Sequence, residues 1–300
     1  MVIVKKWLSM PDKPIISEAQ ERAVAALSTV VPEPGAPKSD PILLADKIQR
    51  NFGGVVAVDV DHIEIQRGSI TALIGPNGAG KTTLFNLLTG FDTPDNGEWR
   101  FDGLSMEKVV AHKTAAMGMV RTFQLTKSLT KMSVIENMKL GATHQVGEKW
   151  WNGLLPFRWK KQEQIIEQRA DALLKRFKLD HMRSEYAGTL SGGQRKLLEM
   201  ARALMTNPRL VMLDEPMAGV NPALKQSLLE HIRGLRDDGM TVLFVEHDMD
   251  MVNDVSDWVI VMAEGRVIAE GTPAQISANP AVIEAYLGSH QGKSLMEEKS

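Results

Sequence analysis

Short and almost uninterrupted apolar runs, rich in Val, Ile and Leu, recur along most of the chain. They are residues 69–75, 210–214, 241–246 and 258–262. Continuous runs of this kind are typical of parallel strands buried on both faces, whereas strands with one wet face alternate between apolar and polar residues. Longer stretches with helical spacing lie between the runs, so the pattern predicts an α/β core built on a parallel sheet.

Helical patterns replace the strand-like runs between residues 123 and 206. Ser133 and Glu136 have the spacing of a capping box, which marks the start of a helix. Further along, one face of a second helix would carry an apolar stripe formed by Ile166, Ala170, Leu173 and Phe177. We therefore expect a helical subdomain, at about residues 124–206, inserted into the α/β core.

The two ends of the chain differ from this core. Residues 1–40 carry prolines at positions 11, 14, 32, 34 and 37 around one short helix-like segment. Because such a composition favours an extended linker, we expect residues 1–40 to be a poorly ordered extension, with a docking arm as the alternative. Residues 289–300 are expected to form a tail.

Composition and charge exclude several classes of protein. The 300 residues carry a formal net charge of −2, which gives no basic footprint and does not suggest nucleic acid as a partner. Cysteine is absent, so disulfides and thiolate zinc sites are excluded. The longest apolar runs, such as TVLFV, fall far short of the roughly 20 residues that span a bilayer. We therefore expect any membrane contact to occur through a partner.

The sequence GPNGAGKTT fits the pattern G-x-x-x-x-G-K-[ST] in the context that the pattern needs, after a buried strand and before a helix. Its glycines let backbone N–H groups face phosphate oxygens at the N-terminus of that helix. Lys81 adds a positive charge for the β- and γ-phosphates, and the Thr82 hydroxyl can ligate Mg²⁺. We predict a nucleotide site formed by Gly75, Pro76, Asn77, Gly78, Ala79, Gly80, Lys81, Thr82 and Thr83.

Two carboxylates, Asp214 and Glu215, follow directly on a strand-like apolar run. Buried charge is costly, and ligands of open α/β sheets bind at the carboxyl ends of the strands. We therefore predict that Asp214 holds Mg²⁺, through water, and that Glu215 polarises an attacking water as general base. The alternative is a pair of solvated turn residues before Pro216.

A second glycine-rich helix start, LSGGQRKLLEMARAL, lies far downstream at residues 190–204. Ser191 stands where an N-cap would, and the glycines after it leave the first N–H groups of the helix uncovered. Its distance from the first loop favours a site on the γ-phosphate of an ATP held by a different subunit. We predict that Ser191, Gly192, Gly193 and Gln194 complete a nucleotide site between two chains arranged head to tail.

Over about residues 41–288 the chain resembles the ATP-binding subunits of ABC transporters. GPNGAGKTT looks like their Walker A motif, LSGGQ their signature, LVMLDE their Walker B motif and AGVNP their D-loop. The resemblance implies a P-loop NTPase (RecA-like) α/β core with a parallel sheet and antiparallel β elements, plus the inserted α-helical subdomain. It also implies a family-type C-terminal segment at about residues 264–288.

The same resemblance gives roles to three further residues. Gln124, in RTFQ, is similar to the Q-loop glutamine and would reach Mg²⁺ and the attacking water. His247, in VEHD, is similar to the switch histidine, which contacts the γ-phosphate. Phe52 falls where the family places an aromatic that stacks on adenine, an interaction worth about 1–3 kcal/mol, with a core position as the alternative.

Several stretches resemble one branch of the family, the ATP-binding subunits of branched-chain amino-acid importers. They include NFGGVVAVDVD, NLLTGFDTPDNGEW and LDEPMAGVNP, in which Asn221 replaces the usual aspartate. The alternatives are a urea or other amide importer, a lipopolysaccharide exporter, or a soluble ABC ATPase of DNA repair or translation. The resemblance implies a second ABC ATPase subunit (a copy or a paralogue), two permease subunits and, indirectly, a solute-binding protein. It places the chain peripherally at the cytoplasmic face of the inner membrane.

Aromatic and basic side chains gather within the expected helical subdomain. They are Lys149, Trp150, Trp151, Phe157, Arg158, Trp159, Lys160 and Lys161. This mixture suits a membrane interface or a protein contact, and a packed surface loop is the alternative.

Overall fold

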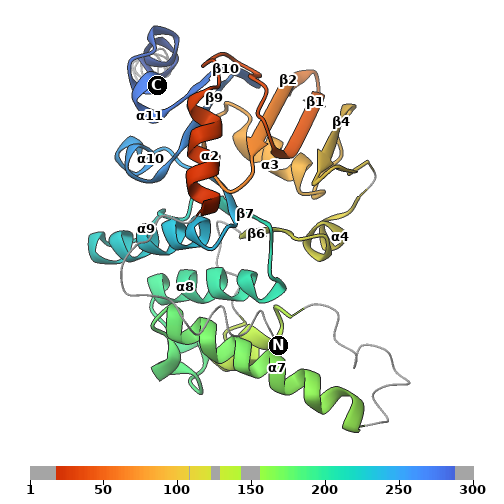
Figure 1. Ribbon diagram of the computed structural model, residues 1–300, viewed down its shortest axis with the longest axis vertical. Helices are drawn as coiled ribbons and strands as arrows, with labels where there is room; N and C mark the ends of the chain where they lie inside the picture. Colours follow the sequence, from red (N-terminus) through yellow and green to blue (C-terminus); the bar gives the residue numbers. More distant parts are fainter. Residues whose placement is uncertain (1–17, 108, 123–128, 143–155, 288–300) are drawn as a thin grey trace.

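The computed structural model describes residues 18–107, 109–122, 129–142 and 156–287 (Figure 1). A six-stranded sheet with the order β10-β9-β3-β8-β7-β6 forms its centre. Its strands are β3 (Ile70–Ile74), β6 (Met119–Thr122), β7 (Leu210–Asp214), β8 (Thr241–Val245), β9 (Trp258–Ala263) and β10 (Arg266–Gly271). Neighbouring strands are parallel except β9 and β10. Every residue of β3, β7 and β8 is buried, which confirms the parallel strands predicted from continuous apolar runs.

A smaller antiparallel sheet has the order β2-β1-β4-β5. Its strands are β1 (Pro41–Phe52), β2 (Val55–Gln66), β4 (Asn96–Phe101) and β5 (Leu104–Ser105). Together with α3 (Lys81–Leu88) it encloses one apolar core, to which Leu73 of β3 contributes. The alternate β3 residues Ile70, Ala72 and Ile74 belong to a second core on the helical side. The central sheet therefore separates two cores, and the loop after β3 emerges between them.

The helical subdomain covers the second core. It contains α5 (Val134–Lys139), α7 (Pro156–Arg176) and α8 (Gly192–Ala203). Figure 1 shows α9 (Pro222–Asp237), α8 and α7 one below another. Ser133 and Glu136 form the predicted capping box at the start of α5. Ala170 and Leu173 are buried on α7, and Phe177 is buried directly after its end. The structure describes residues 129–142 and 156–206 of this subdomain. No strand is present within these two ranges, as the helical pattern of the sequence predicts.

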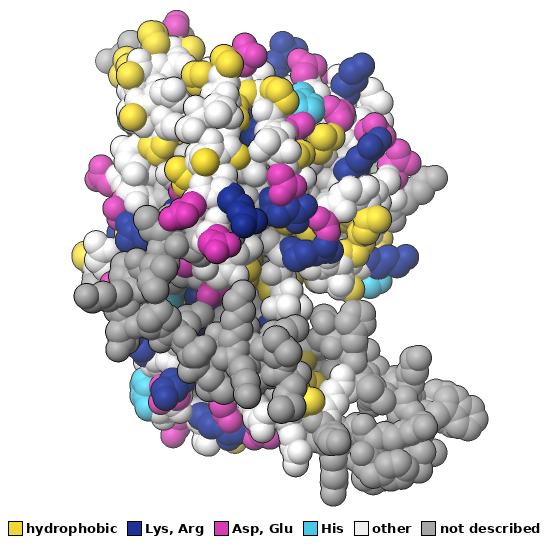
Figure 2. All heavy atoms as spheres, viewed as in Figure 1, with side chains coloured by type: hydrophobic (Ala, Val, Ile, Leu, Met, Phe, Trp, Pro, Cys, Tyr) yellow, Lys and Arg dark blue, Asp and Glu magenta, His cyan; other side chains and the backbone are white. Residues whose placement is uncertain are grey.

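Four further helices belong to the described fold. They are α4 (Ala111–Ala116), α9 (Pro222–Asp237), α10 (Met249–Val255) and α11 (Pro273–Ser277). None of the helices within the described ranges is long and apolar enough to cross a membrane. On the face drawn in Figure 2, basic and acidic side chains of the described residues are interspersed rather than gathered by sign.

Residues 18–40, whose composition favours an extended linker, pack on the rest of the domain. Helix α2 (Glu18–Ser28) lies beside α9, and its Ala23 and Leu27 side chains are buried (Figure 1). The physical reason is that the segment between the prolines carries Ala23 and Leu27 at the spacing of one helical face, so it has apolar surface to bury. Residues 1–17 and 288–300 lie outside the described residues.

A buried ion pair fixes the end of this arm. Lys38 and Glu270 meet at 2.5 Å between Nζ and Oε2, and each side chain is only 1% exposed. The Glu270 carboxylate also accepts hydrogen bonds from the Ala36 backbone N–H and the Trp258 indole N–H. Because the carboxylate has several donors and the ammonium ion also donates to the Ala36 carbonyl, the buried charges are well compensated. The arm is thereby tied to β9 and β10.

Candidate nucleotide-binding site

The glycine-rich loop runs from the end of β3 to the start of α3. Gly80 occupies the N-cap position of α3 with φ +94°, and no side chain caps the helix. A Cβ atom would lie 2.3 Å from the Ala57 carbonyl oxygen at Gly80 and 2.0 Å from the Met262 carbonyl oxygen at Gly75. Only glycine allows these approaches. The loop therefore offers the backbone N–H groups of an uncapped helix start, the arrangement that binds phosphate.

Lys81, the first residue of α3, folds over this loop. Its ammonium group donates to the carbonyl oxygens of Gly75 at 2.7 Å and Pro76 at 2.8 Å. Burial lowers the pKa of Lys81, while the negative charge of Glu215 acts in the opposite direction. Thr82 is exposed, and so are Asn77 and Gly78 of the loop. The cation, a hydroxyl and the loop backbone are thus placed together within the same helix start.

The end of β7 brings the two predicted carboxylates close to this loop. Asp214 is buried and forms an ion pair with Arg121 of β6, with 2.6 Å between Nη2 and Oδ2. The Arg121 guanidinium also donates to the Asn86 side chain on α3 at 2.6 Å. Arg121 thereby links β6, β7 and α3. This cation was missed by the sequence analysis, although it lies in the RTFQ motif, because nothing local identifies its partners.

A magnesium site at this position would need few protein ligands. Within the described residues there is no cluster of three or more His, Cys, Asp or Glu side chains that could hold a metal by itself. Mg²⁺ usually keeps several waters and binds through one or two carboxylates together with substrate phosphates. The exposed Thr82 hydroxyl and the Asp214 carboxylate, which Arg121 links to α3, fit that kind of site.

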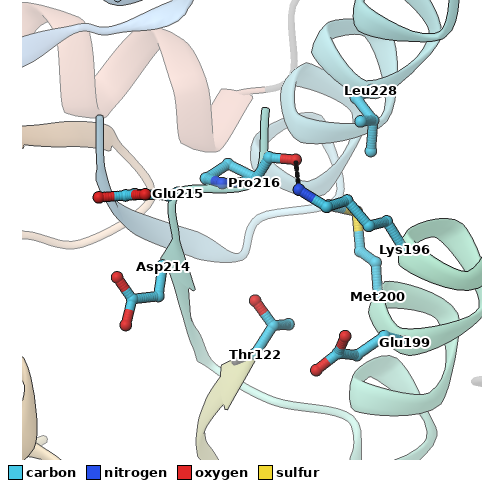
Figure 3. Close-up of a pocket in the computed structure, with 8 residues that line it drawn as sticks. All are labelled: Thr122, Lys196, Glu199, Met200, Asp214, Glu215, Pro216 and Leu228. Atoms are coloured by element: carbon cyan, nitrogen blue, oxygen red, sulfur yellow. Dashed lines mark hydrogen bonds between the residues drawn. The ribbon is translucent and has the colours of Figure 1, made fainter. Parts of the chain in front are cut away.

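Glu215 has an unusual backbone conformation at the end of the same strand. Its φ is +45°, in the left-handed region that residues other than glycine seldom adopt. Its N–H donates to the Val245 carbonyl oxygen at the end of β8, at 3.1 Å. Figure 3 shows the side chains of Asp214 and Glu215 on one side of β7, at the edge of a hollow also lined by Thr122 of β6.

The residues after β8 complete this edge of the sheet. Glu246 is 1% exposed at its side chain and accepts a hydrogen bond from the Met217 N–H at 2.9 Å. Burial raises the pKa of Glu246, whereas the hydrogen bonds from the Met217 and His247 N–H groups lower it to a smaller extent. The neighbouring His247 is exposed, so its imidazole is accessible at the strand end where a phosphate would be bound.

The second glycine-rich helix start is built differently from the first. The Ser191 hydroxyl accepts from the Gln194 N–H at 3.2 Å, and the Gln194 side chain accepts from the Ser191 N–H at 2.9 Å. Ser191 is therefore the predicted N-cap, and the two residues form a capping box. Gly192 is exposed, with open space where a Cβ would lie. Helix α8 lies between α9 and α7, whereas α3 lies among the strands (Figure 1).

Phe52 and Asn221 are two further residues that the sequence analysis singled out. Phe52 ends β1 with 48% of its surface exposed, so the alternative of a core position does not fit. The Arg50 guanidinium lies 4.8 Å from the centre of its ring. Asn221 is the N-cap of α9 and accepts from the Leu224 N–H at 2.9 Å, a role that asparagine fills as well as aspartate. Gln124 lies outside the described residues, as do Trp150 and Trp151.

Two family models match the chain, that of the ABC transporter over residues 58–218 and that of the branched-chain amino acid ATP-binding cassette transporter over residues 266–291. A probable branched-chain amino acid transport ATP-binding protein, LivG of Archaeoglobus fulgidus, is 42% identical over 252 residues, covering 84% of this chain and 97% of that protein. The high-affinity branched-chain amino acid transport ATP-binding protein LivG of Escherichia coli is 41% identical over 253 residues. This match covers 83% of this chain and 99% of that protein.

The fold has solved counterparts as well. The crystal structure of the ADP conformation of an ATP-binding cassette of an ABC transporter is 38% identical. Its TM-score is 0.73, and the match covers 83% of this chain and 100% of that one. These similarities confirm the P-loop NTPase fold predicted from the sequence. The chain belongs to the ABC transporter family, as one of its ATP-binding proteins, and it is an ATPase.

Proposed function

We propose that this chain hydrolyses ATP in a head-to-tail dimer and thereby drives the uptake of branched-chain or related amino acids through partner permeases. The main support for an ATPase site is one observation. The start of α3, which has no side-chain cap and allows only glycine at two positions of its loop, lies beside the carboxylates at the end of β7. The C-terminal family match over residues 266–291 and the names of the relatives support the class of solute.

ATP binding would use residues of one chain for the base and the phosphates. The exposed Phe52 ring would stack on adenine, and stacking depends little on which base is present. The N–H groups of the loop from Gly75 to Thr83 would hold the phosphates, with the Lys81 charge on their β- and γ-oxygens. Mg²⁺, when bound, neutralises phosphate charge, and the Thr82 hydroxyl, Asp214 and the Gln124 side chain would hold it.

Hydrolysis would depend on the carboxylate of Glu215. It would orient a water and accept its proton as the water oxygen bonds to the γ-phosphorus and the bond to the bridging oxygen of ADP breaks. The exposed His247 imidazole and Gln124 would assist from the γ-phosphate side. The start of α8 in the second subunit, from Ser191 to Gln194, would close the site over the γ-phosphate.

Glu215→Gln tests the general base in the full-length chain. ATP binding should persist, because the loop and Phe52 are unchanged, while hydrolysis should fall by at least about 10²- to 10⁴-fold. Glu230→Gln, an exposed position on α9, is the control and should hydrolyse ATP at the unaltered rate. Near-normal turnover in Glu215→Gln, measured as phosphate release, would remove Glu215 from this role.

The proposed partners are a second ATP-binding subunit, which is either a copy or a paralogue, two permeases and, outside the membrane, a solute-binding protein. The chain would then lie peripherally at the cytoplasmic face, with no role for nucleic acid. Permeases that co-purify with the tagged chain should support ATP-dependent uptake of labelled leucine into proteoliposomes, with competition by isoleucine and valine. Uptake of urea but of none of these amino acids would contradict the proposed solute, and co-purification without permeases would contradict transport.

A further inference from the structure

The turn that follows Glu215 is held by side chains from two other elements. Lys196, on α8, donates from its ammonium group to the carbonyl oxygens of Pro216 at 3.1 Å and Ala218 at 2.5 Å. On the opposite side of the peptide chain, the buried Glu246 carboxylate accepts from the Met217 N–H at 2.9 Å. Backbone groups of three successive residues, 216–218, thus have charged partners that lie far from them in the sequence.

These contacts surround a residue whose backbone needs support. Glu215, with φ +45°, is in a sparsely populated backbone conformation, which persists only where the surrounding structure imposes it. Residues 216–218 follow Glu215 directly, so a change in the path of their backbone would reorient its carboxylate. The hydrogen bonds from Lys196 and to Glu246 supply this constraint.

The direction from which Lys196 approaches separates it from the nucleotide site. In Figure 3 its side chain reaches Pro216 from α8, on the side of the turn away from the carboxylates of Asp214 and Glu215. Burial lowers the pKa of Lys196, against the opposing charge of three nearby carboxylates. Its ammonium group donates to the carbonyl oxygens of Pro216 and Ala218, so it holds the turn from the side that faces away from these carboxylates.

We propose that Lys196 is a positioning residue, which connects the start of α8 to Glu215 within one chain. Ser191 caps the same helix little more than one turn earlier, at a rise of about 1.5 Å per residue. The proposed function requires the start of α8 to close over a nucleotide held by the other subunit. A shift of α8 on closure would then move Lys196 and the turn that it holds, and so change the position of the Glu215 carboxylate in this chain's own site. Each site then adjusts to the occupancy of the other.

Hydrogen exchange on the full-length chain tests the contact without relying on ATPase activity. In Lys196→Met, the amides of Glu215, Met217 and Ala218 should exchange at least about tenfold faster, because the carbonyl groups on both sides of Met217 lose the ammonium group that binds them. Lys196→Arg, which keeps charged donors, should protect the turn. Arg195→Met, one residue earlier on α8, is the control and should exchange as the unaltered protein does. Unchanged exchange in Lys196→Met would overturn the proposal.

Steady-state kinetics separates positioning from nucleotide binding. Lys196→Met should lower kcat roughly 10- to 100-fold, the range that misplacement of a catalytic group by about 1 Å can cause, with KM for ATP changed less than about threefold. Lys196→Arg should recover most of kcat. A rise in KM without a fall in kcat, or equal losses in both variants, would contradict a positioning role.

A dimer in which one subunit is altered and its partner is size-tagged distinguishes this inference from the proposed function. Photoactivatable ATP, trapped with vanadate, labels the subunit whose loop holds it. Lys196→Met should strongly reduce trapping on the altered subunit itself, through its own Glu215, whereas Ser191→Arg should abolish trapping on the partner. If Lys196→Met instead leaves trapping on its own subunit unchanged and abolishes trapping on the partner, the positioning role of Lys196 is wrong, while the nucleotide site shared between two subunits is still supported. If Ser191→Arg disables its own subunit, the shared site fails.

Discussion

The chain begins two helices with glycine-rich sequence, and the two starts are built in opposite ways. At α3 the N-cap is Gly80 in a left-handed conformation, no side chain caps the helix, and backbone oxygens leave no room for a Cβ. At α8 the N-cap is Ser191, which shares a capping box with Gln194, and Gly192 faces open space. The backbone of neighbouring strands thus packs closely on the start of α3, whereas the start of α8 is exposed at Gly192 and is capped by its own side chains.

This difference indicates why one chain would carry both. The loop at α3 is shaped by neighbouring strands, so its N–H groups are arranged for phosphate before any partner arrives. The start of α8 is capped by its own side chains and leaves Gly192 accessible, while Gly193 packs against Leu224. An accessible helix start can bind an anion that another molecule presents. Changes at α3 should therefore affect stability and nucleotide binding, and changes at α8 should affect the closed dimer.

The largest expected effect follows from Gly80→Ala. A Cβ there meets the Ala57 carbonyl oxygen at 2.3 Å in a left-handed backbone, so the free energy of unfolding should fall by about 2–4 kcal/mol, and ATP binding should be lost. Gly78→Ala is the matched control, since its φ is +82° but a Cβ would find open space, and it should cost only about 1–2 kcal/mol. Urea unfolding and nucleotide titration measure both. Equal losses for the two variants would show that the close approach at Gly80 does not matter.

The next effect is on affinity alone. Lys81→Ala removes the ammonium group next to the loop, and loss of a charged hydrogen-bond partner of phosphate should weaken ATP binding by about 1.5–3 kcal/mol, or roughly 10- to 150-fold. Ser191→Ala, measured on the isolated subunit by calorimetry, should bind ATP as the unaltered chain does. A comparable loss of affinity in the isolated Ser191→Ala subunit would place both helix starts in one chain's site.

A smaller effect concerns the cap itself. Ser191→Ala should lower the free energy of unfolding by about 1 kcal/mol, because the Gln194 N–H loses its acceptor. Ser133→Ala removes a capping box of the same type at the start of α5 and should cost a similar amount. Only Ser191→Ala should also reduce hydrolysis at saturating ATP. If the two variants reduce hydrolysis equally, the loss reflects helix stability and not a contact with nucleotide.

The smallest expected change in stability is that of Gly192→Ala. Its Cβ would meet nothing within 4 Å, and its φ is outside the left-handed region, so the free energy of unfolding should change by less than about 0.5 kcal/mol. Hydrolysis by the dimer should nevertheless fall, since the new methyl group occupies the surface that would meet the γ-phosphate. A variant with full hydrolysis would indicate that this surface has no close partner.

The sequence predicted those features that depend on neighbouring residues. The run LVMLD is continuous and apolar and became β7 with the expected bounds, and the spacing of Ser191 and Gln194 gave a capping box. Contacts between distant residues left no local pattern. Lys38 and Glu270 are 232 positions apart, and Arg121 and Asp214 are 93 apart. The docked arm and the cation beside Asp214 therefore became visible only in the fold.

The most direct test of the shared site uses a dimer in which only one subunit carries Ser191→Arg, again with a size-tagged partner. The long side chain should block the surface at the start of α8 while leaving Lys81, Thr82 and Phe52 of the same subunit intact. Labelled nucleotide trapped during hydrolysis should then remain at the altered subunit's own loop and be lost from its partner's loop. Retention by the partner, with loss from the altered subunit, would show that α8 acts on the nucleotide of its own chain and would contradict the account.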